Sequence, residues 1–571
     1  MRWGFWPPIA VAVVACSTSH LSDGTTMADS GAAGPSDAGG GGDDAPPIDA
    51  ASLFTGLAPF QDIAAAAGLP SAGGMCLVSD DFDGDGKPDI FVATFAGPPP
   101  QTMTLFLNDG AAHFKPMPVA PIKFTGQGTS LGWCAAGDFD GDGRLDVALA
   151  SFLGFEVHIL KNMGGGAFAD ALTLTAPLGD LSYSGIAVAD FDGDGWLDLF
   201  VAPYTESPLM SQRDCAPQVD GYACVVPGPR CQPPPIVFRN SGTSAIGFLP
   251  PTSVTDASAC GPANTNALAI TDWNGDGRPD VFVANDWGTN RLYLNGMGAP
   301  GASPAFSDVF PGLGAKAYNS GMGAAFEDFD FDGQLDLYVS DMGSDQFYLG
   351  SGGHLVAHNR EWGVSQPTRL HSGWAPLAED FDSDGFPDVY VASAAFVGDY
   401  DDLATVGNGG QLQERVQYDV LLQNQGGHAF AARGVPQTTA SEPFSVFGAT
   451  AVADFDGDGR LDIAEAIGYP VRFELLHNMS PSQHWIDVRL SGKSPNVDGI
   501  GATVTLGVAG KPPWKRLVQR SRGSNGSSWA ALHFGLGQVA AIDHIDVQWP
   551  DGTTQTVPAP PADALLTIRK P

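Results

Sequence analysis

Basic residues are scarce in this 571-residue chain, which has 27 Lys and Arg against 64 Asp and Glu and a formal net charge of −37. Binding to nucleic acid depends on Lys and Arg that neutralise phosphates, so this balance excludes a nucleic-acid partner. Long hydrophobic runs are also missing. The apolar stretch from Gly4 to Ala15 is too short to span a bilayer. We therefore expect an exported, acidic protein that contacts a membrane only through an attached lipid.

The N-terminus has the features of an export signal. Arg2 and the short apolar stretch predict a signal peptide over residues 1–15. The sequence Val13-Val14-Ala15-Cys16 resembles a bacterial lipobox, which predicts cleavage before Cys16 and lipid on its thiol. An ordinary signal peptide with an incidental cysteine is the alternative. Residues 16–50 have almost no large apolar side chains and predict a disordered tether rich in Gly, Ser, Asp and Pro.

Cysteine is rare, with seven residues, and no C-x-x-C pair indicates a zinc site. Six remain after Cys16, an even number that favours disulfides in an exported protein. Four of them lie close together in one insertion and predict two bridges: Cys215, Cys224, Cys231 and Cys260. Cys76 and Cys134 precede the first two copies of a repeated motif. We expect these two to pair between neighbouring repeats, with two small buried thiols as the alternative.

Glycine and proline are abundant, with 74 and 45 residues, which favours short strands and turns over helices. Within this background the pattern D-x-[DN]-x-D-G-x-x-D occurs seven times. Calcium takes six to eight oxygen ligands, and a tight loop can direct positions 1, 3 and 5 at one ion, with Gly at position 6 for the sharp turn. Position 7 varies freely, as expected of a backbone carbonyl ligand. We predict up to seven Ca²⁺ sites, with Mg²⁺ less suited because it retains its waters.

The candidate metal ligands occupy positions 1, 3, 5, 7 and 9 of each loop. They are Asp81, Asp83, Asp85, Lys87 and Asp89; Asp138, Asp140, Asp142, Arg144 and Asp146; Asp190, Asp192, Asp194, Trp196 and Asp198; Asp272, Asn274, Asp276, Arg278 and Asp280; Asp328, Asp330, Asp332, Gln334 and Asp336; Asp380, Asp382, Asp384, Phe386 and Asp388; and Asp454, Asp456, Asp458, Arg460 and Asp462. Asn274 removes one charge, so we expect the fourth site to bind more weakly.

The loops are not EF-hands, because an EF-hand needs Glu at position 12 and flanking helices. Position 12 of the first loop is Val92, and an apolar β segment follows each loop. Each loop belongs to a longer unit of predicted strands, whose third strand ends in Asn or a similar residue. In several units a Phe then opens a fourth strand, as at Phe168, Phe306 and Phe430. Seven such units predict a seven-bladed β-propeller. The seventh unit lacks its fourth strand, and residues 60–69 resemble the missing segment, so the N-terminal strand is expected to complete the last blade.

The repeats resemble the FG-GAP or VCBS type of integrin α-chain propellers, and residues 484–557 resemble the ASPIC/UnbV domain in HWIDVRLSGKSPNVDGIGATVTLG, LHFGLG and IDVQWPDGTTQTV. Together they are similar to the cartilage acidic protein family, which includes lipoprotein-like bacterial members. The four-cysteine insertion and Asn274 depart from that pattern. We thus expect an all-β chain with a propeller over residues 51–482 and a small β-sandwich-like domain over residues 483–571, in which Trp485, Phe534 and Trp549 are core residues.

The expected function is that of a monomeric, calcium-dependent binding or adhesion scaffold for a surface protein or glycan, displayed as a bacterial outer-membrane or cell-surface lipoprotein or otherwise secreted. Both large insertions are predicted on the face opposite the loops, where binding residues often lie. The candidate ligand-binding residues are Tyr222, Trp287, Asp399, Tyr400, Asp401 and Asp402. The alternative is a calcium-dependent lyase or hydrolase acting on polysaccharide. A deep pocket that holds His or Tyr beside carboxylates would favour the enzyme.

Overall fold

The computed structural model describes residues 54–69, 73–94, 102–122, 131–151, 156–175, 182–204, 214–218, 221–225, 234–254, 264–286, 288–316, 320–341, 344–368, 372–394, 418–436, 446–469, 472–522 and 526–571. Several predictions concern residues outside these ranges: the signal peptide, Cys16 and the tether, Cys231, Cys260, Trp287 and residues 399–402.

The described part of the chain is built from β-strands. Its helices are one four-residue turn, α1 (Ser365–Thr368), and a three-residue 3₁₀ turn (Phe310–Gly312). In the ranges that the structure covers, no helix has the length and apolar character needed to cross a membrane. The predicted all-β class is therefore confirmed.

Seven sheets each contain one acidic loop between their first two strands, and each sheet has four antiparallel strands from this repeat. In chain order the sheets are β2 (Cys76–Asp80), β3 (Asp89–Ala93), β4 (Met103–Asn108) and β5 (Phe114–Val119); β6 (Leu131–Gly137), β7 (Asp146–Ser151), β8 (Glu156–Gly164) and β9 (Ala167–Thr175); β10 (Ser182–Ala189), β11 (Asp198–Tyr204), β14 (Ile236–Phe238) and β15 (Thr252–Ser253); β16 (Asn264–Thr271), β17 (Asp280–Asp286), β18 (Arg291–Asn295) and β19 (Phe306–Asp308); β20 (Gly321–Glu327), β21 (Asp336–Asp341), β22 (Gln346–Ser351) and β23 (His354–Ala357); β24 (Ser372–Glu379), β25 (Asp388–Ala394), β26 (Tyr418–Asn424) and β27 (Phe430–Pro436); and β28 (Val446–Ala453), β29 (Asp462–Tyr469), β30 (Arg472–Asn478) and β1 (Phe60–Asp62).

The last sheet takes its fourth strand from the N-terminal end of the described chain. β1 pairs antiparallel with β30, with Phe60 opposite Asn478 and Asp62 opposite Leu476. The prediction that the N-terminal segment supplies the missing strand is confirmed. Because this pairing joins positions separated by more than 400 residues, it ties the start of the repeat region to its end.

Neighbouring sheets pack through their first strands, which carry small and apolar residues and are largely buried. In order, β2, β6, β10, β16, β20, β24 and β28 each contact the next, and β28 also contacts β2. The Cys76–Cys134 disulfide joins β2 to β6. The expectation that these two cysteines pair between neighbouring repeats is confirmed.

A side-chain bridge recurs where two sheets meet. The Asn at the end of a third strand donates through its Nδ2 to the backbone carbonyl of the second residue of the preceding loop, at 2.6–3.0 Å, in six junctions. At the same six junctions a Phe of the fourth strand or its approach packs against the Phe at that second position, with centroids 5.6–6.0 Å apart. The residues singled out in the sequence as strand ends thus fasten one sheet to the next.

The C-terminal part contributes two further sheets that share a buried core. One has the order β35–β31–β38 and the other β33–β32–β36–β37. The strands are β31 (His484–Ser491), β32 (Thr503–Gly507), β33 (Trp514–Leu517), β35 (Leu532–Gly537), β36 (His544–Gln548), β37 (Thr554–Pro558) and β38 (Ala564–Arg569). Phe534 and Trp549 are buried as predicted, whereas Trp485 is only half-buried and lies against Gly459 of the seventh loop.

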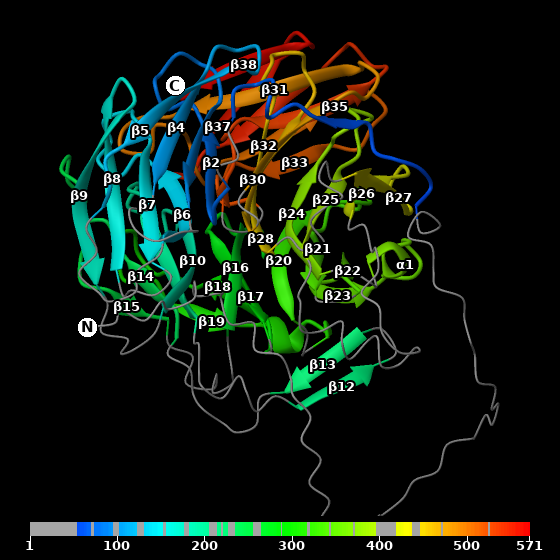
Figure 1. Ribbon diagram of the computed structural model, residues 1–571, viewed down its shortest axis with the longest axis horizontal. Helices are drawn as coiled ribbons and strands as arrows, with labels where there is room; N and C mark the ends of the chain where they lie inside the picture. The colour runs from blue at the N-terminus through cyan, green and yellow to red at the C-terminus, as the bar shows by residue number, and fades with distance from the viewer. Residues whose placement is uncertain are drawn as a thin grey trace, which may run out of the picture.

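The two ends of the molecule carry different additions. Figure 1 shows β31, β35 and β38 at the top and the hairpin of β12 (Asp214–Gln218) and β13 (Gly221–Val225) at the bottom. That hairpin belongs to the insertion between β11 and β14, and the other large insertion separates β25 from β26. Both insertions therefore fall between second and third strands, as predicted.

Candidate functional site

The seven acidic loops share one hydrogen-bonding pattern. The carboxylate at position 1 accepts the N–H of the Gly at position 6 at 2.8–3.0 Å in every loop. The carboxylate at position 5 accepts the N–H of position 7, also at 2.8–3.0 Å. The Gly residues have φ between 82° and 95°, a region that side chains rarely adopt. The chain therefore curls so that its carboxylates face a common centre.

The Asp at position 9 has a structural role that the sequence pattern did not reveal. One of its oxygens accepts the N–H of position 2 at 2.8–3.2 Å. Its other oxygen accepts the N–H at the end of the third strand at 2.7–2.9 Å. This carboxylate therefore fixes the loop to its own sheet, whether or not it also coordinates an ion.

In single loops, acidic side chains converge closely enough to share one cation, and in the seventh His477 of the third strand joins them. Ligand atoms lie within 4.8 Å of one another in the groups Asp81, Asp83 and Asp85; Asp138, Asp140 and Asp146; Asp190, Asp192 and Asp194; Asp328, Asp330 and Asp332; and Asp456, Asp462 and His477. The donors are overwhelmingly carboxylate oxygens, with an amide at Asn274. Such oxygen donors suit a hard cation such as Ca²⁺ and do not suit a thiophilic metal.

Burial disfavours the ionised form of these carboxylates when no positive charge lies nearby. Desolvation, reinforced by the other acids of the same loop, raises the pKa of Asp89 and Asp146 to about 7. Desolvation likewise raises the pKa of Asp328 to about 7 and, together with the nearby charge of Asp487, that of Asp454 to about 8. A cation at the centre of the loop would favour the ionised forms.

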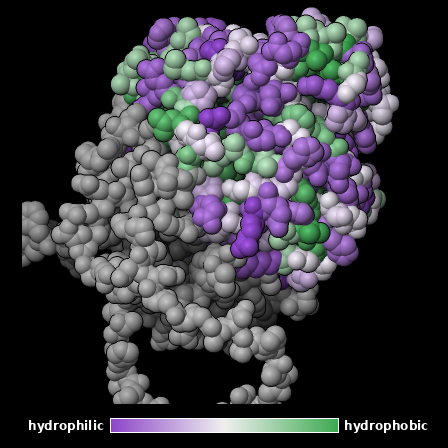
Figure 2. Space-filling view, turned by 90° about the vertical axis from the view of Figure 1, so that its right-hand side faces the viewer, coloured by the Kyte–Doolittle hydropathy of each residue, from purple (hydrophilic) through white to green (hydrophobic). Residues whose placement is uncertain are grey.

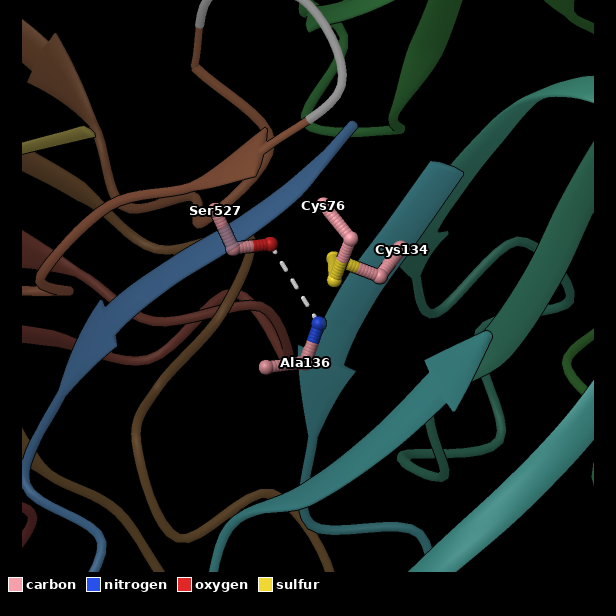
Figure 3. Close-up of a disulfide and its surroundings, with 4 residues drawn as sticks. All are labelled: Cys76, Cys134, Ala136 and Ser527. Carbon is pink, nitrogen blue, oxygen red and sulfur yellow. Dashed lines mark hydrogen bonds between the residues drawn. A yellow bond between two sulfur atoms is a disulfide. The ribbon is translucent and has the colours of Figure 1, made fainter. Parts of the chain in front are cut away.

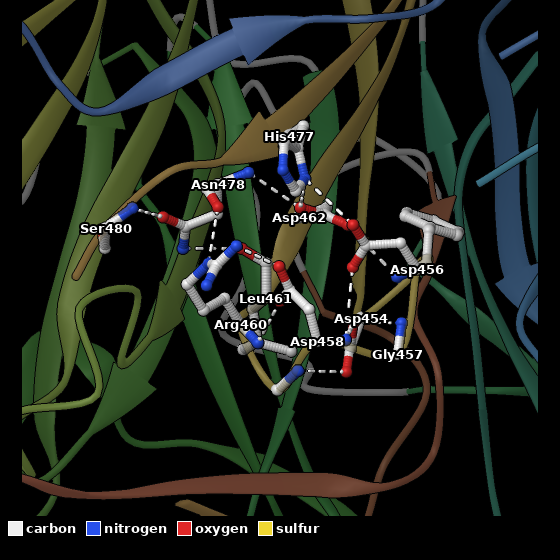
Figure 4. A network of polar contacts seen from close by, with 12 residues as sticks. Asp454, Asp456, Gly457, Asp458, Arg460, Leu461, Asp462, His477, Asn478 and Ser480 are labelled. Carbon is white, nitrogen blue, oxygen red and sulfur yellow. Dashed lines mark hydrogen bonds and ion pairs between the residues drawn. The ribbon is translucent and has the colours of Figure 1, made fainter. Parts of the chain in front are cut away.

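Basic side chains already neutralise part of this charge. In the seventh loop, Arg460 pairs with Asp458 and donates to the carbonyl of Asn478 at 2.7 Å, and His477 lies 3.2 Å from Asp462 (Figure 4). In the second loop, Lys161 pairs with both Asp140 and Asp142. Lys161 and His477 come from third strands, so a search confined to the nine-residue motif could not find them.

The C-terminal sheets cover the same loops. Arg489 lies 3.4 Å from Asp81 of the first loop, and Gln483 donates to the backbone carbonyl of Asp382 at 2.9 Å. Ser494 donates to the carbonyl of Gly141 at 3.4 Å. The loop face is thus an interface between the repeat sheets and the C-terminal sheets. The sequence alone did not predict this arrangement.

A segment from the C-terminal part, described over residues 516–522 and 526–528, lies among the first strands of the repeat sheets. Its strand β34 (Gly526–Ser527) pairs in parallel with β2. The hydroxyl of Ser527 accepts the N–H of Ala136 at 3.3 Å, beside the Cys76–Cys134 disulfide (Figure 3). Ser521 and Ser528 accept the N–H groups of Val188 and Val452 in the same way, at 3.5 and 3.2 Å. The segment therefore bridges sheets that are distant in sequence.

Arginines of this segment form buried ion pairs with the repeat sheets. Arg516 lies 3.0 Å from Glu327 of β20 and 2.7 Å from Glu379 of β24, and all three side chains are at most 6% exposed. Burial alone would raise the pKa of Glu379, but the charges of Arg516 and Arg522 lower it. A cluster of arginines in an otherwise acidic chain is the sequence signal that could have revealed this contact.

Most of the predicted ligand-binding residues on the opposite face lie outside the described ranges. Trp287 and residues 399–402 lie outside the described ranges, and Tyr222 is placed only as a backbone position in β13. In the same hairpin, Cys215 and Cys224 are direct partners across the β12–β13 ladder. This register places the two residues side by side, and their pairing remains a prediction.

One arrangement bears on the enzyme alternative. His533 lies 2.8 Å from Asp487 through Nδ1 and 3.4 Å from the Ser383 hydroxyl through Nε2. Ser383 and His533 are only 3% and 2% exposed, and both ring nitrogens already have partners within the chain. Ser383 belongs to the sixth acidic loop, so these contacts join that loop to the C-terminal sheets.

A second serine motif also bears on that alternative. Residues 128–132 read G-T-S-L-G, which matches the G-x-S-x-G pattern of serine hydrolases. That pattern supplies a nucleophile at a strand-to-helix turn. Here its last two residues begin strand β6, and Ser130 itself lies outside the described ranges.

Two family models match this chain. Residues 492–571 match ASPIC and UnbV, and residues 81–149, 154–201, 272–339 and 328–391 match the FG-GAP-like repeat. The chain thus carries an ASPIC and UnbV domain behind FG-GAP-like repeats, which confirms the resemblance seen in the sequence.

Similar proteins have been described in vertebrates. Cartilage acidic protein 1 from Xenopus tropicalis is 24% identical over 526 residues, which cover 86% of this chain and 73% of that protein. The Homo sapiens protein of the same name is 23% identical over 524 residues, covering 86% and 71%. T-cell immunomodulatory protein from Homo sapiens is 28% identical over 273 residues, covering 46% and 42%. Among solved structures, BBS1N in complex with ARL6DN aligns with a TM-score of 0.41 and 9% identity over 75% of this chain and 99% of that chain. A score this low decides nothing about the fold.

Proposed function

We propose that this protein is an extracellular, calcium-dependent binding scaffold that presents a protein- or glycan-binding surface on a closed seven-bladed β-propeller. The observation that carries the proposal is the repeated loop, whose carboxylates converge in one hydrogen-bonding pattern in all seven sheets. Seven sites that each fix the conformation of a loop suit a protein that presents a rigid binding surface better than one built around a single catalytic centre.

Closure of the sheets into a ring is supported by contacts between its first and last members. β28 contacts β2, and β1 completes the sheet of β28. The Asn108 side chain reaches Phe455 in the same way that Asn162 reaches Phe82 between the first and second sheets. A ring leaves only short strand edges exposed, which limits aggregation of an all-β chain.

Calcium is the ion that best fits these loops. Position 1, 3 and 5 side chains would hold it together with the backbone carbonyl of position 7. The bound ion would supply charge neutralisation and fix the loop conformation. Because the C-terminal sheets lie directly on the loops, through contacts such as Arg489 with Asp81 and Gln483 with Asp382, an ordered loop also supports that interface.

The remaining parts of the proposal concern display at the cell surface. Extracellular location agrees with the FG-GAP-like repeats and with the cartilage acidic protein relatives. A lipid on Cys16 and a tether to residue 50 would hold the scaffold away from the membrane. On the coloured part of the face in Figure 2, hydrophobic residues form separated patches among hydrophilic ones, so this part presents no broad apolar surface to a second copy of the chain.

The enzyme alternative is favoured by one observation. A cavity of about 430 Å³ between the first and seventh loops and the C-terminal sheets is lined by His533, Asp487 and Glu379. The histidine is buried, with both nitrogens engaged, so it would have to change partners before it could move a substrate proton. Binding therefore remains the function that the geometry supports better.

A binding array tests the proposal. The purified chain, without its export signal, is applied to arrays of glycans and of cell-surface proteins in millimolar calcium and again in EDTA. We expect selective binding in calcium that disappears in EDTA. Equal binding in both conditions would contradict a calcium-dependent scaffold, and release of shortened polysaccharide products would favour the enzyme instead.

A further inference from the structure

The junction between the fourth and fifth repeat sheets lacks both features that fasten the other six. At the end of β22, where six sheets have Asn, this sheet has Gly350, which has no side chain to donate. At position 2 of the fourth loop, where six loops have Phe, the residue is Trp273. Trp273 packs instead against Phe326 of β20, with centroids 6.1 Å apart. The regular repeat is therefore broken at this one junction.

A cavity opens at this junction. Its volume is about 430 Å³, and its walls come from the fourth loop, from β20 and the fifth loop, and from the C-terminal strands β32 and β33 with the segment that follows them. Trp273 and Phe326 contribute aromatic surface. The volume lies in the range of pockets that bind small molecules. Gly350, which stands where the other six sheets have the bridging Asn, is one of its lining residues.

Three buried polar atoms that belong to residues lining this cavity have no hydrogen-bond partner among the described residues: Thr271 Oγ1, Gln519 Oε1 and Arg522 Nη2. Thr271 is 2% exposed, and the Arg522 side chain is 10% exposed. Arg522 uses its other terminal nitrogen to bind Glu379 at 2.7 Å. Buried polar groups are costly when unpaired, so these side chains favour a polar ligand in the cavity toward which they can turn.

We propose that this cavity binds a saccharide unit. The inference rests on the proposed binding function and gives it a site and a ligand class. Sugar hydroxyls both donate and accept, so one ring can pair with Gln519 Oε1 and Arg522 Nη2 when small rotations turn these enclosed atoms toward the cavity. The apolar face of a sugar ring packs on aromatic side chains such as Trp273. A simple anion would leave the Gln519 oxygen without a donor, and an apolar ligand would leave all three atoms unpaired.

Titration calorimetry with the chain in millimolar calcium tests the proposal. The probes are methyl glycosides of glucose, galactose, mannose, N-acetylglucosamine and glucuronic acid, together with their common disaccharides. The variants are Trp273→Phe, which installs the residue of the other six loops, and Gln519→Met, which removes the orphaned acceptor at similar volume. The control is Trp485→Phe, which alters the other cavity. Thermal melts show which variants are folded.

We expect at least one probe to bind, and each of the two cavity variants to weaken it about tenfold, as loss of one hydrogen bond or stacking contact would. Trp485→Phe should leave the affinity unchanged. A deoxy analogue that lacks the recognised hydroxyl should bind more weakly still. Binding weakened only by Trp485→Phe, or binding that none of the variants alters, would overturn the assignment. If no saccharide binds while a surface protein does on the array, this inference fails and the proposed scaffold stands.

Discussion

The Asn108 side chain donates to the carbonyl of Phe455 at 2.9 Å and so joins the first repeat sheet to the last. Its Nδ2 also donates to the backbone carbonyl of Pro88 at 3.0 Å, and its Oδ1 accepts the N–H of Gly110 at 3.0 Å. We predict that Asn108→Ala lowers the free energy of unfolding by about 1 to 3 kcal/mol, because a buried carbonyl loses its donor. Chemical denaturation measures the change.

The matched control for this change is Asn162→Ala, at the junction of the first and second sheets, where the bridge to Phe82 is also 2.9 Å long. In a closed ring the two variants should be destabilised to a similar degree. A loss for Asn162→Ala alone would mean that the first and last sheets are not joined in solution.

The disulfide between Cys76 and Cys134 is expected to stabilise the contact between β2 and β6. It closes a loop with a sequence separation of 58, for which chain entropy predicts about 4 kcal/mol at most. The double variant Cys76→Ser/Cys134→Ser should melt at a lower temperature than the oxidised protein and at the temperature of the reduced protein. If reduction leaves the melting temperature of the parent unchanged, the bridge does not contribute to stability.

The buried pairing of Arg516 with Glu327 and Glu379 should hold the C-terminal sheets in place. Arg516→Ala leaves the buried carboxylate of Glu327 without its arginine and leaves Glu379 with Arg522 alone, and breaking a buried pair costs about 3 to 5 kcal/mol. We expect faster proteolysis of the C-terminal part and a lower melting temperature. Arg569→Ala, an exposed change at the end of β38, is the control and should have no effect on either. Equal behaviour of the two variants would contradict the role assigned to Arg516.

The facing carboxylates Glu465 and Glu474, paired across β29 and β30, predict a pH effect. Desolvation first, and then the charge of Asp419, raise the pKa of Glu474 to about 7 and that of Glu465 well above its usual value. A folded-state pKa above the unfolded value means that the folded protein binds more protons between about pH 4.5 and 7. Stability from this pair is therefore present at low pH and is lost as the pH rises through that window.

Glu474→Gln removes this titration and keeps the shape of the side chain. Relative to the parent, the variant should gain stability as the pH is raised from 5 to 8, on a scale of about 1.4 kcal/mol per unit of pKa shift at most. Melting temperatures at several pH values, with the exposed Asp551→Asn as control, measure the trend. A stability difference that is constant with pH would contradict it.

The sequence predicted the repeat sheets well because the nine-residue loop fixes a turn between two strands, and the Asn and Phe positions mark where the third and fourth strands meet the next sheet. It also predicted that β1 completes the last sheet, since residues 60–69 match the segment missing there. It did not predict that the C-terminal sheets cover the acidic loops. Contacts such as Arg516 with Glu379 or Ser527 with Ala136 join residues far apart in the chain, and single positions carry no periodic signal for them.

The cavity at the fourth junction shows the same limit. The sequence marks Asn274 as a lost charge in the fourth loop, but the bridging Asn is missing at Gly350 in the fifth sheet. Which loop loses its bridge depends on which sheets are neighbours. Conversely, the motif predicts the position 9 Asp only as a candidate ligand, whereas its two backbone hydrogen bonds give it a structural role in every sheet. Repeated residues reveal architecture, and departures from the repeat reveal sites only after the fold is known.

Calcium loading of the seven loops is the central claim. Seven ions would add 14 positive charges and change the formal charge from −37 to −23. Sites of this kind outside cells often bind with dissociation constants of roughly 10⁻⁴ to 10⁻³ M, so EDTA should empty them. A ligand at about 100 times its dissociation constant stabilises the folded state by about 2.7 kcal/mol per independent site.

Calcium content and melting temperature, measured together on the same preparation in EDTA and in millimolar calcium, test this claim most directly. We predict up to seven bound ions, a melting temperature clearly higher in calcium than in sodium chloride of equal ionic strength, and a smaller shift in the Asp456→Ala/Asp458→Ala variant, in which six loops remain intact. No bound calcium together with equal melting temperatures in EDTA and calcium would contradict the account.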